Sequence, residues 1–300
     1  NMDNNILTDS EIIFIDGDSN DESSNIISES FKSTTLNFKI ITNSRKIVPI
    51  SLNMGIKISK GSPIIRLDVH TFYPSNYISE LIASFNKLKA DNIGGVSIAK
   101  SFSDTNKGNL MALLLRSKFG VGNSSFRTGV DKITETDTVV YGCYDRDVFS
   151  KIGYFNEKLE RNQDIELNSR IKQFGGKIFT IPSIKSYYYP GDNYKSFFVK
   201  SFKNGLWNIK TIKITKRIKS LRVRHFIPLI FLIYILMFPL GFMIISYYYV
   251  IPFVIYLSIG LYAAVGNNLK FKNSVEFIFI ALITHVSYGF GSLCGIIKFK

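Results

Sequence analysis

Cysteine is scarce in this chain. Its 300 residues include only two, Cys143 and Cys294, which cannot supply a disulfide framework or a zinc ligand set. An apolar signal-peptide core is also missing from the start, where Asn1–Ser10 is polar. We therefore expect a soluble part that folds and stays in a reducing cytoplasm.

Charged residues are absent from one long stretch. None occurs from Phe226 to Gly266, and Val275–Ile297 contains only Glu276. Because about 20 apolar residues cross a bilayer, the first stretch is long enough for two spans and the second for one. Prolines and the tyrosines at 247–249 mark a hairpin between the first two. The sequence predicts about three transmembrane helices.

Acidic residues are fewer than basic ones, 23 against 37, which gives a formal net charge of +14. Such a balance suits nucleic acid or an anionic membrane surface. The basic residues cluster just before the first predicted span, where they favour a membrane and not nucleic acid; they are Lys210, Lys213, Lys216, Arg217, Lys219, Arg222 and Arg224. We expect residues 1–224 on the cytoplasmic side, although Lys298 and Lys300 leave the direction of the third span open.

Apolar runs rich in β-branched residues alternate with helical patterns in the soluble part. The predicted strands are Ile12–Ile15, Phe38–Ile41, Ile64–Leu67, Gly95–Ile98, Thr138–Tyr141 and Ile178–Ile181. The predicted helices are Glu22–Phe31, Val48–Ile58, Asn76–Leu88 and Asp104–Ser117, followed by a long loop over Gly120–Thr136. This alternation predicts an α/β domain with a mostly parallel sheet, whose ligands bind at the carboxyl ends of the strands.

A further helix is predicted next to the membrane segments. Phe198, Phe202 and Leu206 recur four apart between Asn193 and Trp207, with lysines pointing elsewhere. An apolar face of this kind suits a helix lying in the plane of the headgroups. A helix packed on the rest of the protein remains the alternative.

Acidic residues follow the first predicted strand. Asp16 and Asp18 lie directly after Ile15, and Gly17 between them allows a ligand to approach the backbone. Carboxylates in this place can bind a ribose or a base. A turn that caps the next helix is an equal alternative.

Asp68 and His70 follow the strand Ile64–Leu67, and strand alternation would place both on one side. They could then share a divalent cation that neutralises a diphosphate. A carboxylate suits Mg²⁺ or Mn²⁺, and imidazole shifts the preference toward Mn²⁺. A structural role for the pair is the alternative.

Asp164 lies at the start of a helix that begins at Gln163 and closes at Gly175-Gly176. The helix dipole would keep its carboxylate ionised, as a base that activates a hydroxyl must be. Plain N-capping of the helix is the alternative.

Seven segments in order resemble family 2 glycosyltransferases, in the branch of succinoglycan-type exopolysaccharide transferases. They read EIIFIDGDSNDES, SLNMGIKISKG, IIRLDVHTFYP, DNIGGV, FGVGNSSFR, TDTVVYGCYDRDVFSKIGYFNE and RNQDIELNSRIKQFGG. The resemblance implies a GT-A fold related to the Rossmann fold, a nucleotide-diphosphate sugar as donor and a divalent metal. It also implies that transfer inverts the anomeric centre.

The same resemblance assigns roles to individual positions. Asp16, Asp18, Lys46, Asn53 and Asp68 would bind the nucleotide sugar, Asp68 and His70 the metal, and Asp164 would be catalytic. Glu166, Trp207 and Arg127 are candidates for contacts with the acceptor or for loop positions.

The chain departs from the family pattern in three places. A first, central strand would precede Glu11, and too few residues stand there. Gln163 replaces the Glu of the family's Glu-Asp pair. Where processive members carry Gln-x-x-Arg-Trp, residues 203–207 keep only Trp207, which favours transfer of one sugar.

These observations predict a catalytic domain over 1–192 without its first strand, an interfacial basic segment over 193–224 and a membrane domain over 225–300. The predicted enzyme is a multi-pass hexosyltransferase of the inner membrane that adds one sugar to a saccharide acceptor during surface polysaccharide synthesis. A polyprenyl-diphosphate-linked saccharide is the candidate acceptor, and membrane lipids are the other expected partners. A processive synthase and a catalytically silent partner of another transferase are the alternatives.

Overall fold

The computed structural model describes residues 9–298 and contains two compact units. The first, here the sheet unit, comprises Asn1–Val96 and Val130–Ser186, and the second, the helical unit, comprises Ser97–Gly129 and Tyr187–Lys300. Residues 97–129 thus group with the C-terminal helices, an association that the sequence pattern does not indicate. The three-part division predicted above stays a prediction.

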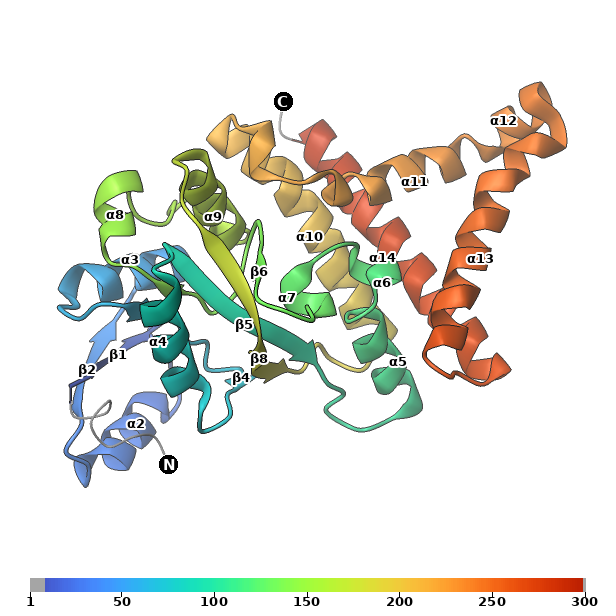
Figure 1. The fold of residues 1–300 in the computed structure, drawn as a ribbon. Helices are drawn as coiled ribbons and strands as arrows, with labels where there is room; N and C mark the ends of the chain where they lie inside the picture. Colours follow the sequence, from blue (N-terminus) through green and yellow to red (C-terminus); the bar gives the residue numbers. More distant parts are fainter. Residues whose placement is uncertain (1–8, 299–300) are drawn as a thin grey trace. The chain divides into compact units, whose positions relative to one another are not determined.

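The strands form two sheets. They are β1 (Glu11–Asp16), β2 (Asn37–Thr42), β3 (Ile64–Ile65), β4 (Thr71–Phe72), β5 (Asn92–Ala99), β6 (Thr134–Glu135), β7 (Cys143–Tyr144) and β8 (Ile178–Tyr188). β1 and β2 pair in parallel as a sheet of their own, and the second sheet has the order β3-β7-β5-β8-β4, with β6 paired to β8. The long strands β5 and β8 run side by side in the same direction (Figure 1), whereas β7 is antiparallel to β3 and β5.

The helices of the sheet unit agree with the sequence prediction, with one exception. They are α2 (Ser23–Lys32), α3 (Val48–Ile58), α4 (Tyr77–Leu88), α8 (Asp147–Ile152) and α9 (Gln163–Gln173), of which α8 is not predicted. Leu81 of α4 is fully buried with Ile93 of β5 in one apolar cluster, and Leu167 of α9 with Ile178 of β8 in another. Helices packed on a mixed sheet confirm the predicted α/β, GT-A-like fold class.

One predicted strand is wrong. Thr138–Tyr141 is irregular, and Tyr141 has a left-handed backbone (φ 52°) that a strand cannot accommodate. The amide of Asn168 donates to the hydroxyl of Thr138 (2.8 Å) and to the carbonyl of Val139 (3.2 Å). This side chain takes the place of a neighbouring strand, and the actual strand, β7, begins two residues later.

The parallel pair β1–β2 is joined to its unit through α3 and the segment after it. Gly55 of α3 lies against Ile15, and the carboxylate of Glu11 accepts hydrogen bonds from the backbone N–H groups of Lys60 and Gly61. The further central strand expected from the family pattern stays a prediction.

The helical unit carries the remaining elements. They are α5 (Asn106–Leu114), α6 (Lys118–Val121), α7 (Ser125–Thr128), α10 (Tyr194–Thr215), η1 (Ile218–Ser220), η2 (Val223–His225), α11 (Ile227–Leu236), α12 (Phe238–Ile245), η3 (Ser246–Val250), α13 (Ile251–Gly266) and α14 (Phe271–Lys298). The predicted loop Gly120–Thr136 is therefore partly ordered into α7 and β6. Its Ser124 carbonyl accepts from Arg127 and Thr128, which builds a helical turn the Gly/Ser/Thr composition hides.

Two helical stretches among residues 9–298 are long and apolar enough to cross a membrane, Phe238–Gly266 and Phe271–Lys298. The sequence predicts about three. The difference arises because Phe238–Gly266 forms one such stretch, whereas the apolar helical stretch before it, Val223–Leu236, is too short for a second.

Helix α10 packs along α14 through small residues. A Cβ on Gly205 would meet the carbonyl oxygen of Tyr288, and one on Gly291 that of Phe202, each at 1.9 Å. Phe197 and Trp207 are buried, whereas Phe198 is 44% exposed. The packed arrangement left open above is therefore present on one face of α10, and contact of the Phe198 face with headgroups stays a prediction.

We expect Gly291→Leu to lower the thermal midpoint of the detergent-solubilised protein, because the two helix backbones would have to separate. Overpacking costs about 1–3 kcal/mol where side chains can adjust, and a backbone neighbour adjusts less. Gly266→Leu is the control, since nothing lies within 4 Å of a Cβ there. Equal midpoints for the two variants would contradict the close packing of α10 on α14.

Candidate active site

Asp68 lies in a turn between β3 and β4. Strand β3 ends at Ile65, and the backbone N–H of Thr71 donates to the carbonyl of Asp68 (3.2 Å), which turns the chain at Val69 and His70. Strand alternation therefore does not apply to Asp68 and His70, and the expectation that it places them on one side is wrong. His70 is exposed, whereas Asp68 is partly buried.

Arg66 joins two of the predicted site residues. Its guanidinium donates Nε and Nη2 to the two carboxylate oxygens of Asp68, both at 3.0 Å, and Nη1 to the carboxylate of Asp164. The side chain of Arg66 is 7% exposed, that of Asp68 21% and that of Asp164 16%. A planar guanidinium fixes the direction of a carboxylate that it binds in bidentate fashion. Two acidic groups 96 residues apart in the chain (164 − 68) are thus held at one place.

Asp164 occupies the first turn of α9, as predicted. Its carboxylate accepts a hydrogen bond from the guanidinium of Arg66, and the choice between a base and an N-capping group stays a prediction. Burial raises the pKa of Asp164 above its ordinary value, Arg66 opposes that rise, and the charge of Asp68 adds to it. A carboxylate with a raised pKa is a stronger base, which is what proton abstraction from a hydroxyl requires.

Tyrosines fix the turn that carries Asp68. The backbone N–H of Asp68 donates to the hydroxyl of Tyr73 (2.8 Å), and the hydroxyl of Thr71 donates to that of Tyr141 (2.8 Å). The rings of Tyr73 and Tyr141 meet edge to face, with centroids 5.6 Å apart. Desolvation by this packing raises the pKa of Tyr73, so its hydroxyl stays protonated. The loop that carries the carboxylate of Asp68 is therefore held in place by hydrogen bonds and ring packing.

The strand ends of β1 and β2 bring together three predicted donor-binding residues. Asp16 accepts from the backbone N–H (3.0 Å) and the hydroxyl (2.6 Å) of Ser19, and these bonds lower its pKa. The ammonium of Lys46 lies 3.2 Å from the carboxylate of Asp18 and donates to its carbonyl at 3.1 Å. Asp18 and Lys46 are exposed, so both could exchange this pair for a ligand. Asp16 thus forms a turn with Ser19, whereas the backbone N–H of Ser23 at the start of α2 donates to Asp21 (3.0 Å), so a role of Asp16 in capping that helix stays a prediction.

Asn53 of α3 is buried, and its side chain holds neighbouring segments of the sheet unit together. Its amide donates to the carbonyl of Phe155 (2.9 Å) and to Glu157 (3.1 Å) and accepts from the N–H of Phe155 (3.0 Å). Arg45, in the loop beside Lys46, lies 3.5 Å from the same Glu157. The loop after β2 is thus tied to the segment that leads into α9. Direct contact of Asn53 with a donor stays a prediction.

The three acceptor candidates are all engaged with other groups. Glu166 of α9 is buried and pairs with Arg170 (2.8 Å), whose guanidinium also holds the carbonyls of the loop after α8. In the helical unit, Arg127 of α7 donates to the hydroxyl of Tyr188, and Trp207 of α10 lies under the ammonium of Lys210 at 4.4 Å. Their contacts with an acceptor stay predictions.

The carboxylate oxygens of Asp68 fit one mode of metal binding. No group of three or more His, Cys, Asp or Glu side chains within residues 9–298 could hold an ion, so a closed cage is excluded for this part. Mg²⁺ is commonly bound by one or two carboxylates together with substrate phosphates and water. The two oxygens of Asp68 keep further lone pairs beside their bonds to Arg66.

Two features of the site cannot be predicted from the sequence pattern. Arg66 stands inside the IIRLDVH segment, but nothing in the pattern says that it reaches Asp164. Behind it, Asn92 of β5 donates to Asn168 of α9 (2.8 Å), and both are fully buried. A buried amide pair locks α9 to the sheet and so helps to hold Asp164 in place. The sequence signal for it is a polar Asn92 directly before the apolar part of a strand, which begins at Ile93.

The pH dependence of sugar transfer should reflect the protonation of the Asp164 carboxylate. Because the pKa of this carboxyl is raised, the base protonates, and kcat/KM falls, at a pH above that of an ordinary aspartate. The pH profile of kcat/KM for the unchanged protein checks it, and an acidic limb at the pH of an ordinary aspartate would show that another group is titrating.

Residues 4–153 match the model of glycosyl transferase family 2, which is half of the chain. The chain is 27% identical over 200 residues to a dolichyl N-acetyl-alpha-D-glucosaminyl phosphate 3-beta-D-2,3-diacetamido-2,3-dideoxy-beta-D-glucuronosyltransferase of Methanococcus voltae, covering 65% of this chain and 62% of that protein. It is 26% identical to succinoglycan biosynthesis protein ExoA of Rhizobium meliloti, and this match covers 61% of this chain and 55% of that protein. The matches thus span less than two thirds of either relative.

Among solved structures, that of S. aureus TarS 1-349 is similar at 15% identity and a TM-score of 0.47, covering 97% of this chain and 85% of that one. The family match spans β1 to the end of α8, including the strand ends with Asp16, Asp18 and Asp68. On this match the chain belongs to glycosyl transferase family 2.

Proposed function

We propose that this chain is a membrane-associated, inverting glycosyltransferase that moves one sugar from a nucleotide-diphosphate sugar to a lipid-linked saccharide. The observation that carries the proposal is the grouping of Asp68 and Asp164 around Arg66. In this proposal, Asp68 serves the donor phosphates and Asp164 the acceptor hydroxyl. The family membership and the names of the two relatives support the reaction class.

In the proposed reaction, Asp164 accepts the proton of the acceptor hydroxyl. The hydroxyl oxygen forms a bond to the anomeric carbon while the bond to the donor diphosphate breaks, and attack opposite the leaving group inverts that carbon. A divalent cation held at Asp68 would neutralise the leaving diphosphate. Arg66 fixes both carboxylates, so their separation does not depend on the substrates.

Asp16, Asp18 and Lys46 would bind the nucleotide. Asp16 stands at the carboxyl end of a parallel strand, where such folds bind nucleotides. Lys46 could turn from Asp18 to a phosphate, because surface ion pairs of this kind are worth only about 0–1 kcal/mol. The hydrogen bonds of buried Asn53 to Phe155 and Glu157 support a fixed distance between this loop and the segment that leads into α9.

Membrane attachment is supported by the two long apolar stretches at the C-terminal end. The basic residues before them favour a cytoplasmic catalytic part at an anionic surface. A lipid-linked acceptor would then meet the site at the bilayer. The name of the Methanococcus relative, which includes a dolichyl-linked sugar phosphate, supports this choice.

We expect Asp68→Ala to abolish the metal-dependent part of donor binding. Calorimetry of the purified protein with UDP, with and without Mn²⁺ or Mg²⁺, measures it. His70→Ala is the comparison. A similar loss of metal-dependent UDP binding would support an ion shared by Asp68 and His70. Unchanged binding would mean that, of these two residues, Asp68 alone binds the metal. If Asp68→Ala binds UDP and Mn²⁺ as the unchanged protein does, the metal assignment is wrong.

A further inference from the structure

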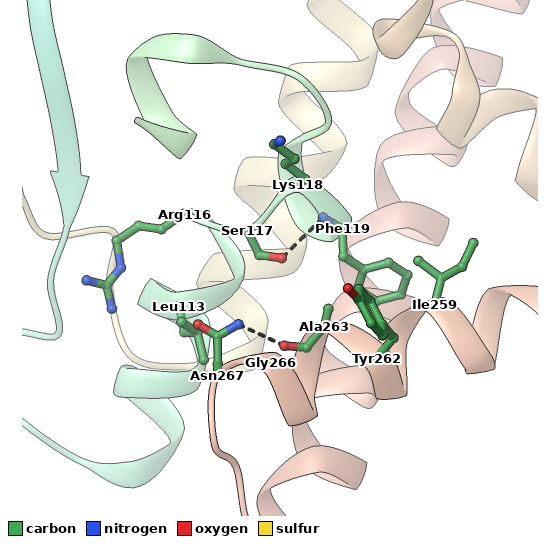
Figure 2. A pocket seen from close by; sticks show the side chains of 10 residues that line it. All are labelled: Leu113, Arg116, Ser117, Lys118, Phe119, Ile259, Tyr262, Ala263, Gly266 and Asn267. Atoms are coloured by element: carbon green, nitrogen blue, oxygen red, sulfur yellow. Dashed lines mark hydrogen bonds between the residues drawn. The ribbon is translucent and has the colours of Figure 1, made fainter. Parts of the chain in front are cut away.

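A cleft opens in the helical unit beside the end of α13. It has a volume of about 620 Å³, which lies within the range of small-molecule sites. Its lining residues come from α5–α6 and from the last turns of α13; they are Leu113, Arg116, Ser117, Lys118, Phe119, Ile259, Tyr262, Ala263, Gly266 and Asn267 (Figure 2). None of the residues considered above for donor or acceptor binding lines it.

One wall of the cleft is apolar and firmly packed. The ring of Phe119 lies 5.1 Å from that of Tyr256, centroid to centroid, and 3.0 Å from the position of a Cβ on Gly260. At the cleft's edge the hydroxyl of Ser117 accepts from the N–H of Phe119 (3.1 Å), a bond drawn in Figure 2. These contacts hold α6 on α13, so the cleft is a feature of the packed unit.

The other part of the lining is cationic. Arg116 and Lys118 are both exposed, and neither enters a salt bridge with any residue of 9–298. Figure 2 shows the side chain of Arg116 extending from the segment that joins α5 to α6 and that of Lys118 extending from the start of α6 in a different direction. No acidic residue lines the cleft. Two unpaired cations without a counter-charge favour an anion.

The place of the cleft along α13 indicates the kind of anion. The candidate span Phe238–Gly266 ends at Gly266, which lines the cleft together with Asn267. Toward the middle of the span, Ile259 is 51% and Tyr262 82% exposed. If this stretch crosses the membrane, its end lies at headgroup level, and its apolar face continues from the cleft into the acyl region. Both properties suit a ligand with an anionic head and a hydrocarbon tail.

We propose that this cleft binds the phosphate headgroup of a membrane lipid, with the positive charge of Arg116 and Lys118 attracting the phosphate and the hydrocarbon chain lying along Ile259 and Tyr262. Free phosphate would use the cations alone and gain nothing from the apolar wall. Binding here is independent of the proposed transfer reaction, so each can fail without the other.

The test is lipid binding to the full chain in neutral detergent, measured by native mass spectrometry. The probes are phosphatidic acid, a long-chain isoprenyl phosphate, phosphatidylcholine and inorganic phosphate. We expect both lipid phosphates to bind at least tenfold more tightly than phosphatidylcholine. Arg116→Gln combined with Lys118→Gln should weaken them about 30-fold, since each cation near a headgroup contributes roughly fivefold.

A second pair of substitutions controls for the loss of positive charge. Lys270→Gln with Lys272→Gln removes the same charge from the connection after α13 and from the first turn of α14 without touching the cleft, and should change binding less than threefold. Ala263→Phe, which fills the cleft and keeps both cations, should weaken binding at least tenfold. Thermal midpoints confirm that each variant is folded.

Three outcomes overturn the proposal. Equal losses from the two charge pairs would mean that the surface attracts lipids without a site. Unchanged binding in Ala263→Phe would place the lipid elsewhere. Complete displacement of the lipid phosphates by millimolar inorganic phosphate would mean that the cleft recognises a soluble anion. The relative affinity of the two lipid phosphates shows which hydrocarbon chain the wall prefers.

Discussion

Replacing Asp164 by asparagine should lower kcat for sugar transfer by about 10²–10⁴-fold, because the amide cannot accept the proton of the acceptor hydroxyl. The change keeps the size of the side chain, and its oxygen can still accept from Arg66. Affinity for the nucleotide should therefore stay within about threefold, since the hydrogen bond that remains holds the loop in place. Single-turnover transfer and calorimetry with UDP measure the two effects separately.

Asp147→Asn is the control for this change. It removes a carboxylate from the start of another helix of the sheet unit, α8, where Asp147 is exposed. Its kcat should equal that of the unchanged protein. Transfer by Asp164→Asn at a rate within threefold of the control would remove Asp164 from the reaction and leave the grouping around Arg66 as a structural ion cluster.

The second large effect is expected from Arg66→Met. It leaves the carboxylates of Asp68 and Asp164 partly buried without their counter-ion, and a broken buried ion pair costs about 3–5 kcal/mol. Donor binding and transfer should both be lost, because neither carboxylate keeps its direction. Denaturant unfolding of the protein, followed by tyrosine and tryptophan fluorescence, measures the loss of stability.

A compensating variant separates charge from packing. Adding Asp68→Asn and Asp164→Asn to Arg66→Met removes the unpaired charges and should restore most of the unfolding free energy, but not transfer. Arg45→Met is the matched control, since that guanidinium is 65% exposed and its pair with Glu157 contributes little. If Arg66→Met is no less stable than Arg45→Met, Arg66 does not hold the site together.

The sequence predicts the parts of the site better than their assembly. The strand before Asp16 and the helix that begins at Gln163 are local patterns, and both are confirmed. Arg66, by contrast, meets Asp164 across 98 positions of sequence, and Asn53 meets Phe155 across 102. Such contacts depend on how the elements pack, which hydrophobic periodicity does not specify.

The wrong predictions have physical causes of the same kind. Thr138–Tyr141 has the composition of a strand, but the amide of Asn168 satisfies its polar groups from a helix. Asp68 and His70 are separated by a turn that the carbonyl of Asp68 itself stabilises. In each case a tertiary or local hydrogen bond overrides the preference of the residues for extended backbone.

The packing of α10 shows a further limit. Its apolar residues at 198, 202 and 206 predict one buried or membrane-facing side, yet Gly205 and Ser201 lie on the face that is covered. Small residues let the backbone of α14 approach. A pattern of large apolar residues cannot indicate a contact that glycine makes possible.

The most direct measurement of the central claim is the mass of the lipid-linked product. Membranes containing the chain are incubated with a panel of nucleotide-diphosphate sugars and lipid-linked saccharide acceptors, and the extracted lipids are weighed by mass spectrometry. The account predicts one product, heavier than its acceptor by a single sugar residue, and no product with Asp164→Asn. A ladder of masses would indicate a processive synthase, and no new mass with any donor would contradict the proposed transfer.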